Sequence, residues 1–134
     1  MAEMTLKEWT SAYIKYKDTL HKRIEKIDDS LNNKILILKK DGKKEEHLCE
    51  ENLEQINPAN ITEQKISTLN KKKNVDWLIK NWDSLKNTSS TITFVNTKKS
   101  EHWAISPKMH HLITDKEALK PGIKTLFESV AEMQ

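Results

Sequence analysis

The side chains of this sequence most able to do nucleophilic, acid–base or metal-binding chemistry are those of His47, Cys49, His102, His110 and His111. His47 and Cys49 are two residues apart, so on a β-strand their side chains share one face. If His102 lies on a neighbouring strand, these three residues offer ligand types that zinc binds. Their spacing fits no standard zinc motif and a second cysteine is lacking, which leaves them weak metal candidates.

The same residues do not form a convincing catalytic pair. On one strand, Cys49 and His47 lie roughly 6.5–7 Å apart, which is beyond the reach of direct proton transfer. The adjacent acidic residues Glu45 and Glu46 point to opposite faces of a strand and resemble a solvated surface. The sequence contains no nucleophile elbow, Walker loop, dinucleotide fingerprint or His-Glu-x-x-His motif. We therefore expect a protein that is not an enzyme and uses no cofactor.

Length and composition restrict the class of protein. The chain has 134 residues, a net charge of +3 and a single cysteine. A single domain over residues 1–134 is the expected organisation, and an internal disulfide is excluded. No apolar run approaches the roughly 20 residues that span a bilayer, and the first residues form no apolar signal core. These features predict a cytoplasmic protein without a membrane segment.

The N-terminal region predicts one long amphipathic helix. From Leu6 to Leu31, apolar residues recur at steps of three or four, and Thr5 with Glu8 forms a capping-box pattern at the start. Such a helix is about 40 Å long, more than a small sheet needs for cover, so part of it can pair with another chain. The alternative is that it lies entirely on the sheet of its own domain. The residues proposed to bind a partner protein or a second copy are Trp9, Tyr13, Tyr16, Leu20 and Trp77.

Two segments predict β-hairpins, at about residues 34–49 and 91–106. In the first, Asp41-Gly42 suits a two-residue type I′ turn, which sets Ile35 opposite Leu48. In the second, β-branched and aromatic residues alternate with polar ones on both sides of a polar turn. We expect the two hairpins to form one antiparallel sheet.

Two further helices follow from capping and periodicity. Asn74 can cap a middle helix whose apolar stripe leaves Trp77 outside it, in an exposed position. Thr114 and Glu117 repeat the capping-box pattern before a C-terminal helix. Pro121-Gly122 is expected to split this last helix from the turn before it.

Together the elements predict an α+β fold with two layers. The antiparallel sheet of two hairpins is packed by the long N-terminal helix, a middle helix and a C-terminal helix. Residues 61–69 slightly favour a short helix over a strand. Asp29-Ser30-Leu31 recurs as Asp83-Ser84-Leu85, which raises the alternative of a duplicated helix–hairpin unit.

Lysine-rich segments suggest a second class of partner. Arg23 is the sole arginine among 23 basic residues, which disfavours sequence-specific reading of bases. If both hairpin tips lie at one edge, their lysines and the 71–73 run can contact phosphates together. The alternative is that these lysines merely keep the sheet edges soluble. The proposed phosphate-binding residues are Lys39, Lys40, Lys43, Lys44, Lys71, Lys72, Lys73, Lys98 and Lys99.

The expected function is a small interaction module that binds another protein through the long N-terminal helix or the sheet face. Nucleic-acid binding by the lysine edge is the alternative hypothesis. An enzyme or metal-binding domain that uses the histidine and cysteine residues ranks below both.

Overall fold

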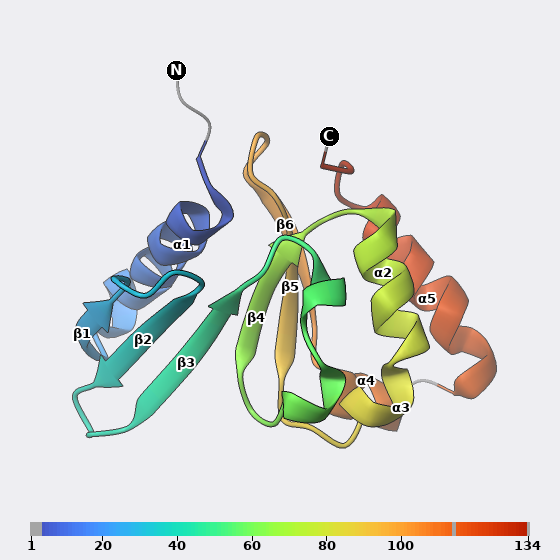
Figure 1. Cartoon of the computed structure of the whole chain (residues 1–134), viewed down its shortest axis with the longest axis horizontal. Helices are drawn as coiled ribbons and strands as arrows, with labels where there is room; N and C mark the ends of the chain where they lie inside the picture. The colour runs from blue at the N-terminus through green and yellow to red at the C-terminus, as the bar shows by residue number, and fades with distance from the viewer. Residues whose placement is uncertain (1–3, 114, 134) are drawn as a thin grey trace.

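A computed structural model describes residues 4–113 and 115–133 (Figure 1). These residues form α-helices, short 3-10 helices and a six-stranded mixed sheet, which confirms the predicted α+β class. In chain order the elements are α1 (Leu6–His21), β1 (Ile24–Asp28), β2 (Lys34–Lys39), β3 (Lys44–Cys49), η1 (Leu53–Gln55), η2 (Pro58–Asn60), β4 (Lys65–Leu69), α2 (Lys72–Lys80), α3 (Trp82–Leu85), β5 (Thr91–Asn96), β6 (Glu101–Ile105), α4 (Pro107–Ile113) and α5 (Lys116–Glu128). None of the helices described is both long enough and apolar enough to cross a membrane.

The strands lie side by side in the order β1-β2-β3-β4-β5-β6. Strands β1, β2 and β3 form an antiparallel meander, β3, β4 and β5 run parallel to one another, and β6 returns antiparallel to β5. Both predicted hairpins are present, as β2–β3 and β5–β6. The sheet is mixed rather than antiparallel throughout, because β4 separates the hairpins and runs parallel to both neighbours.

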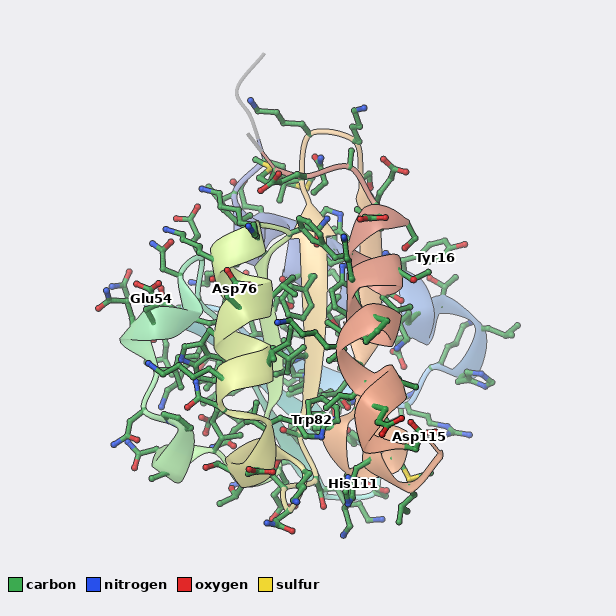
Figure 2. The ribbon with its side chains drawn as sticks, turned by 90° about the vertical axis from the view of Figure 1, so that its right-hand side faces the viewer. Tyr16, Glu54, Asp76, Trp82, His111 and Asp115 are labelled. Atoms are coloured by element: carbon green, nitrogen blue, oxygen red, sulfur yellow. The ribbon has the colours of Figure 1, made fainter. Side chains whose placement is uncertain are left out.

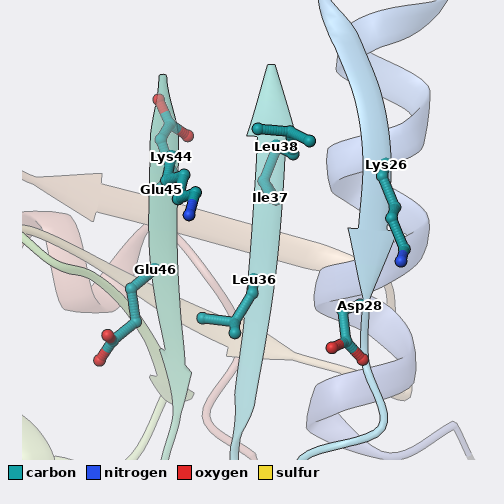
Figure 3. A pocket seen from close by; sticks show the side chains of 8 residues that line it. All are labelled: Lys26, Asp28, Leu36, Ile37, Leu38, Lys44, Glu45 and Glu46. Atoms are coloured by element: carbon teal, nitrogen blue, oxygen red, sulfur yellow. The ribbon is translucent and has the colours of Figure 1, made fainter. Parts of the chain in front are cut away.

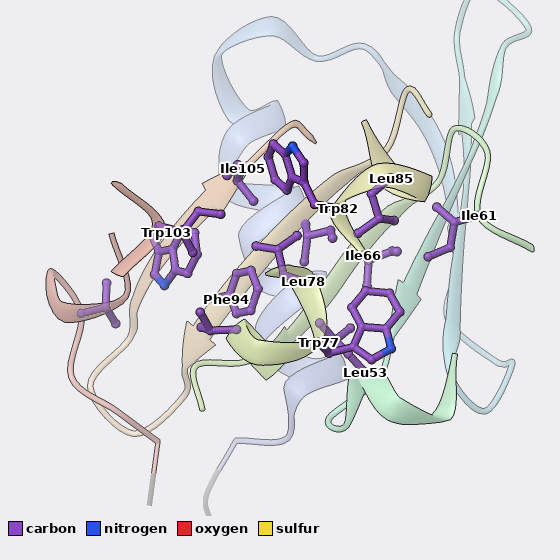
Figure 4. Close-up of a cluster of buried hydrophobic side chains, with 14 residues drawn as sticks. Leu53, Ile61, Ile66, Trp77, Leu78, Trp82, Leu85, Phe94, Trp103 and Ile105 are labelled. Atoms are coloured by element: carbon purple, nitrogen blue, oxygen red, sulfur yellow. The ribbon is translucent and has the colours of Figure 1, made fainter. Parts of the chain in front are cut away.

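Helices cover both faces of the sheet, so the fold has three layers rather than the predicted two (Figure 1). On one face α1 packs against β2, β3 and β4 over one apolar cluster. On the other face α2, α3 and α5 cover β4, β5 and β6 over a larger cluster, built around the Phe94 and Trp103 rings stacked 4.2 Å apart (Figure 4). On this second face, no helix among the described residues lies over the half of the sheet formed by β1, β2 and β3.

Strand β4 lies where the sequence favoured a short helix within 61–69. All residues from Ile66 to Leu69 are buried, because β4 is central and covered on both faces. A strand buried on both faces shows no alternation of apolar and polar residues, so its pattern does not distinguish it from a short buried helix.

The N-terminal helix is shorter than predicted. The Thr5 capping box is confirmed, but α1 ends at His21 and residues 24–28 form β1. Lys22 takes a left-handed conformation at φ 49°, and the Asp18 carboxylate accepts the Arg23 N–H at 2.7 Å. The chain therefore turns back to pair with β2, and the apolar residues of 24–28 reach the same core from a strand.

The first hairpin has the predicted position but its register is shifted by one residue. Ile35 pairs with His47 rather than with Leu48. The Lys39 N–H donates to the Lys43 carbonyl and closes a loop over 40–42, whose last residue, Gly42, has φ +87°. This is the longer hairpin loop that ends in a left-handed residue, not the two-residue turn that the Asp-Gly pair suggested.

The chain contains two glycines, and their replacement by alanine is expected to have opposite effects. Gly42→Ala should lower the free energy of unfolding by about 1 kcal/mol, because a Cβ disfavours positive φ. Gly122→Ala, within α5, should raise it by up to about 1 kcal/mol, because alanine has the higher helix propensity. At neither site does the added Cβ meet an atom within 4 Å, so steric clash does not enter. Denaturant unfolding measures both, and an unchanged or raised free energy of unfolding for Gly42→Ala would contradict the loop conformation.

The C-terminal helix α5 is capped by Asp115, whose carboxylate accepts the Ala118 N–H at 2.8 Å. The predicted capping residue Thr114 lies outside the described residues. Pro121 lies inside α5, so the prediction that Pro121-Gly122 splits the helix is wrong. Ile123, fully buried against the larger core, holds the helix together beyond the proline.

The matched tripeptides do not support a duplicated unit. Asp29-Ser30-Leu31 lies in the irregular segment after β1, whereas Asp83-Ser84-Leu85 lies within α3. Because the two copies adopt different local structures, the sequence match does not correspond to a structural repeat at this place.

Candidate functional site

Trp9 and Tyr13, two of the residues predicted to bind a partner, lie on α1 beside the β5–β6 hairpin. Their rings stack with centroids 4.9 Å apart, and the His102 ring packs edge-on against Tyr13 at 4.6 Å. The His102 Nε2 atom lies 3.1 Å from the Tyr13 hydroxyl, and Trp9 Nε1–H donates to Ser100 Oγ at 3.3 Å. Trp9 is buried, so it belongs to a fixed floor and not to the contact surface itself.

Above this floor, α1 exposes apolar side chains to solvent. Tyr16 is 77% exposed and Leu20 is 83% exposed, one helical turn further along. Tyr16 lies at the margin of the molecule, behind the layer of α2 and α5 in Figure 2. Together with Ala12, one turn before Tyr16, these residues form what we call the α1 stripe. Beside it, Tyr13 and His102 line a groove of about 390 Å³.

Basic side chains flank the α1 stripe. Lys15 and Lys17 are exposed next to Tyr16, and Lys17 Nζ lies 5.3 Å from the centre of the Tyr13 ring. The carboxylates of α1 have other partners: Glu8 completes the capping box and Asp18 accepts backbone N–H groups beyond the helix end. These hydrogen bonds leave both carboxylates charged. Residues 15–23 carry four basic side chains against the one carboxylate of Asp18, so the net charge beside the α1 stripe is positive and suits an acidic partner.

The histidine in the groove is mainly neutral at physiological pH. Burial lowers the pKa of His102, and the positive charge of Lys17 lowers this pKa further. The groove floor is therefore aromatic and uncharged, and the positive charge around it comes from lysines.

Trp77 does not belong to this surface, so the prediction that it is exposed is wrong. It is only 7% exposed and lies in the larger core, where Figure 4 shows it beside Leu53 and Ile66. Helix α2 is covered both by the sheet and by η1. The buried part of the α2 surface is therefore wider than the apolar stripe of this helix, and it includes Trp77.

The lysines predicted to form one basic edge lie at two ends of the sheet. Because β3 and β5 run parallel, the turn before β3 and the turn after β5 are at opposite ends (Figure 1). The first end carries Lys39, Lys40, Lys43 and Lys44, and the other carries Lys98 and Lys99. The 71–73 run follows the C-terminal end of β4 and lies at the same end as Lys98 and Lys99.

Lys39 also belongs to a cluster of charged side chains that joins β2, β3 and β4. The Glu45 carboxylate lies 2.6 Å from Lys39 Nζ, 3.5 Å from Lys65 Nζ and 3.4 Å from His47 Nε2. Burial by itself would raise the pKa of Glu45, but the three partners lower it to about 2. Burial lowers the pKa of His47, which favours a neutral ring beside the carboxylate.

The Glu45 cluster predicts a loss of stability in acid. The pKa of the Glu45 carboxylate is about 2 in the folded protein, below its ordinary value of 4.5. The stability that this carboxylate contributes is therefore complete above pH 4.5 and disappears as the pH falls toward 2. The carboxylate is partly exposed, so screening limits this contribution to about 1 kcal/mol. Glu45→Gln should therefore destabilise the protein at about pH 6 and not at about pH 2, measured by urea unfolding. The exposed Glu54→Gln is the control, and an equal loss at both pH values would contradict the assignment.

The weak metal candidates do not converge. His47 and Cys49 are both buried on the α1 side of β3, whereas His102 lies on β6, three strands away. At about 4.8 Å per strand this separation is about 14 Å, too far for one ion. Burial also raises the pKa of the Cys49 thiol. Within the described part of the chain, no group of three or more His, Cys, Asp or Glu residues could hold a metal ion.

His110 and His111 lie on α4. His110 packs edge-on against Trp82 at 5.7 Å between ring centroids. His111 and Asp115 line a second hollow of about 320 Å³ beside Trp82 (Figure 2). This hollow carries an ion pair between Lys86 and Asp83 at 3.3 Å.

Sequence reasoning missed a buried amide network at the carboxyl ends of the parallel strands. Asn70 follows β4 directly and is fully buried. Its Nδ2 donates to the carbonyls of Val130 (3.1 Å) and Ala131 (3.2 Å), and its Oδ1 accepts Trp103 Nε1–H at 2.8 Å. Asn96, at the end of β5, donates to the Ala131 carbonyl at 3.0 Å. We call residues 130–133, which these amides fasten over the strand ends, the C-terminal strap.

Asn74 is a third member of this buried polar set, and the prediction that it caps α2 is wrong. Lys71 is the N-cap, and Asn74 lies inside the helix with no exposed surface. Its side chain accepts the Leu53 N–H at 2.9 Å and donates to the carbonyls of Glu51 (2.9 Å) and Leu69 (2.8 Å). In parallel sheets, ligands often bind beyond the carboxyl ends of the strands. Here the strap and the amides fill that position.

Comparisons with protein families, with curated proteins and with solved structures found no match to this chain. Among the surfaces described above, the α1 stripe with its aromatic floor combines exposed apolar groups, a packed aromatic support and a net positive flanking charge.

Proposed function

We propose that this protein is a non-enzymatic interaction module that binds an acidic surface of another protein along the α1 stripe. The observation that carries the proposal is the high exposure of Tyr16 and Leu20 on adjacent turns of one helix. Single exposed apolar residues are ordinary, but adjacent ones form a patch that suits a partner. Tyrosine is enriched among the residues that dominate the binding energy of protein interfaces. The stacking of Trp9 on Tyr13 limits the motion of the part of α1 that carries Tyr16.

The flanking charges indicate the kind of partner. Lys15 and Lys17 are exposed on either side of Tyr16 and would attract an acidic protein surface over long range. Such attraction mainly accelerates association and weakens as salt increases. The Trp9 and Tyr13 ring faces are largely occupied by each other and by His102, so they offer little area for stacking nucleic-acid bases.

Tyr16→Glu and Leu20→Glu should each weaken partner binding at least about tenfold, because each places a carboxylate against an acidic apolar surface. A photo-crosslinking residue at position 16, used in the native host, identifies the partner, and titration of the purified partner measures the loss. Leu112→Glu, on α4 and at 73% exposure, is the matched control and should leave binding unchanged.

Unchanged affinity in the Leu20→Glu variant would contradict the proposal. If position 16 crosslinks to a second copy of the chain, and the mass measured by light scattering rises with concentration, the α1 stripe mediates self-association and does not bind an acidic partner.

Nucleic-acid binding is the second candidate, and it is supported by the lysines that do share one end of the sheet. The 71–73 run and Lys98 with Lys99 follow the paired ends of β4 and β5. Such a group binds phosphates without reading sequence, and its affinity falls steeply with salt. RNA and DNA binding that is equal in the wild type and in a Lys71/Lys72/Lys73→Glu variant would exclude this candidate.

A further inference from the structure

The face of β1–β3 opposite α1 forms an open strip, with no described helix over it (Figures 1 and 3). It carries a hollow of about 530 Å³, and Leu36 near its centre is 37% exposed. Neighbouring strands are about 4.8 Å apart, so β1 and β3 are separated by about 10 Å, the diameter of one α-helix. The strip continues the layer occupied by α2 and α5, and it is one helix wide.

Charges on the open strip are sorted along the direction of the strands. The register sets Leu36 between Asp28 on β1 and Glu46 on β3, which gives an acidic row across three strands. The next row on the same face consists of Lys26, Leu38 and Lys44 and is basic. Figure 3 shows both rows. From Leu36 to Leu38 the strip therefore changes from acidic to basic around a pair of leucines, and Lys34, on the same face before Leu36, pairs with Glu46 of the acidic row.

We propose that the open strip binds one amphipathic α-helix of a partner protein, laid along β2 with apolar side chains over Leu36 and Leu38. Acidic side chains of the partner helix face the basic row, and its basic side chains face the acidic row. The positive amino end of a helix prefers the acidic row, so the partner helix runs parallel to β2. This inference does not depend on the α1 stripe, which lies on the other side of the sheet.

An ion pair within the strip is compatible with this arrangement. Lys34 Nζ lies 3.5 Å from Glu46 Oε1, and both side chains are more than a third exposed. Such an exposed pair contributes little, so a basic side chain of the partner can share or replace it.

The sorted charges could also attract a second copy of the chain, but the shape of the fold opposes this. When two copies face each other through their open strips, the acidic row of each copy meets the basic row of the other only if the two-fold axis runs across the strands. It would bring the α2 and α5 layers of both copies, which stand beside the strip, into the same space (Figure 1). A single helix fits beside that layer without this conflict.

The test uses two synthetic peptides of equal composition, each about 14 residues long and held helical by a side-chain staple. Both carry a leucine seam. The first has lysines in its amino-terminal half and glutamates in its carboxyl-terminal half, and the second has these halves exchanged. We expect the wild-type protein to bind the first peptide at least tenfold more tightly, measured by fluorescence anisotropy.

Lys44→Glu combined with Glu46→Lys exchanges two charges of the strip without changing the net charge, and it should reduce this preference to less than about twofold. Leu36→Asp should abolish binding of the first peptide. Tyr16→Glu should change neither affinity, which separates this inference from the function proposed for the α1 stripe. Circular dichroism and urea unfolding confirm that each variant is folded.

Three results would overturn the inference. The first is equal binding, or no binding, of the two peptides by the wild-type protein. The second is an unchanged preference after the Lys44/Glu46 exchange in a folded variant. The third is a concentration-dependent dimer that Leu36→Asp dissociates, which would identify a second copy as the occupant.

Discussion

Asn70→Ala is expected to lower the free energy of unfolding by about 3 kcal/mol or more. The substitution leaves Trp103 Nε1–H, which now donates at 2.8 Å, without its acceptor in the core. It also removes the donor that serves the Val130 and Ala131 carbonyls. Each buried polar group left unpaired costs about 1–3 kcal/mol. Urea unfolding followed by far-ultraviolet circular dichroism measures the loss.

Asn87→Ala is the matched control, because Asn87 donates from an exposed position to the Asp83 carbonyl at 3.2 Å. Its expected change is within about 0.5 kcal/mol. Hydrogen exchange of the Met133 amide, which donates to the Asn70 carbonyl, should accelerate in Asn70→Ala because the C-terminal strap loosens. A loss below about 1 kcal/mol would mean that the strap is held by its apolar contacts and not by the amide.

Local chemistry decided which elements were predictable from the sequence. The Thr5–Glu8 capping box and the two hairpins depend on residues close together in the chain, and all are found where they were predicted. Strand β4 depends on parallel pairing with strands that are distant in sequence, and β1 depends on pairing with β2 across the 29–33 segment. Residues 24–28 kept helical spacing, and 65–69 showed no alternation, so neither segment carried a local sign of its strand.

The candidate surfaces also divide into one that depends on neighbouring residues and one that depends on how the strands pair. The α1 stripe was predictable because a helical period places Tyr16 and Leu20 on one side of α1. The basic edge was not, because its prediction assumed that the hairpins point the same way. A parallel strand between them sends Lys43 and Lys98 to opposite ends.

The buried amides left a weak signal in the sequence. Asn70 comes directly after the buried residues Ile66–Leu69, and Asn96 is the last residue of β5, after Ile92–Val95. An asparagine at the end of a buried strand has to find backbone partners, since its amide is too costly to bury unpaired. Recognising β4 as a strand would have drawn attention to both residues as partners of one further segment.

Trp77→Ala is expected to lower the free energy of unfolding by about 3–5 kcal/mol, the usual loss when a buried tryptophan is truncated to alanine. The helical stripe of 75–85 predicted an exposed ring, and an exposed ring would make the substitution nearly neutral. In the fold, Trp77 is buried in the cluster of Leu53 and Leu78, because η1 covers a second side of α2. Thermal and urea unfolding of the variant distinguish a buried Trp77 ring from an exposed one.

Tyr16→Ala is the control for Trp77→Ala, since it truncates an aromatic residue of α1 that is 77% exposed. Its stability should change by no more than about 0.5 kcal/mol, because few apolar contacts are lost. The two variants thus separate an aromatic residue that holds the fold from one that is available to a partner. A loss below about 1 kcal/mol for Trp77→Ala would place its ring at the surface, and Trp77 would again be a candidate contact residue beside α2.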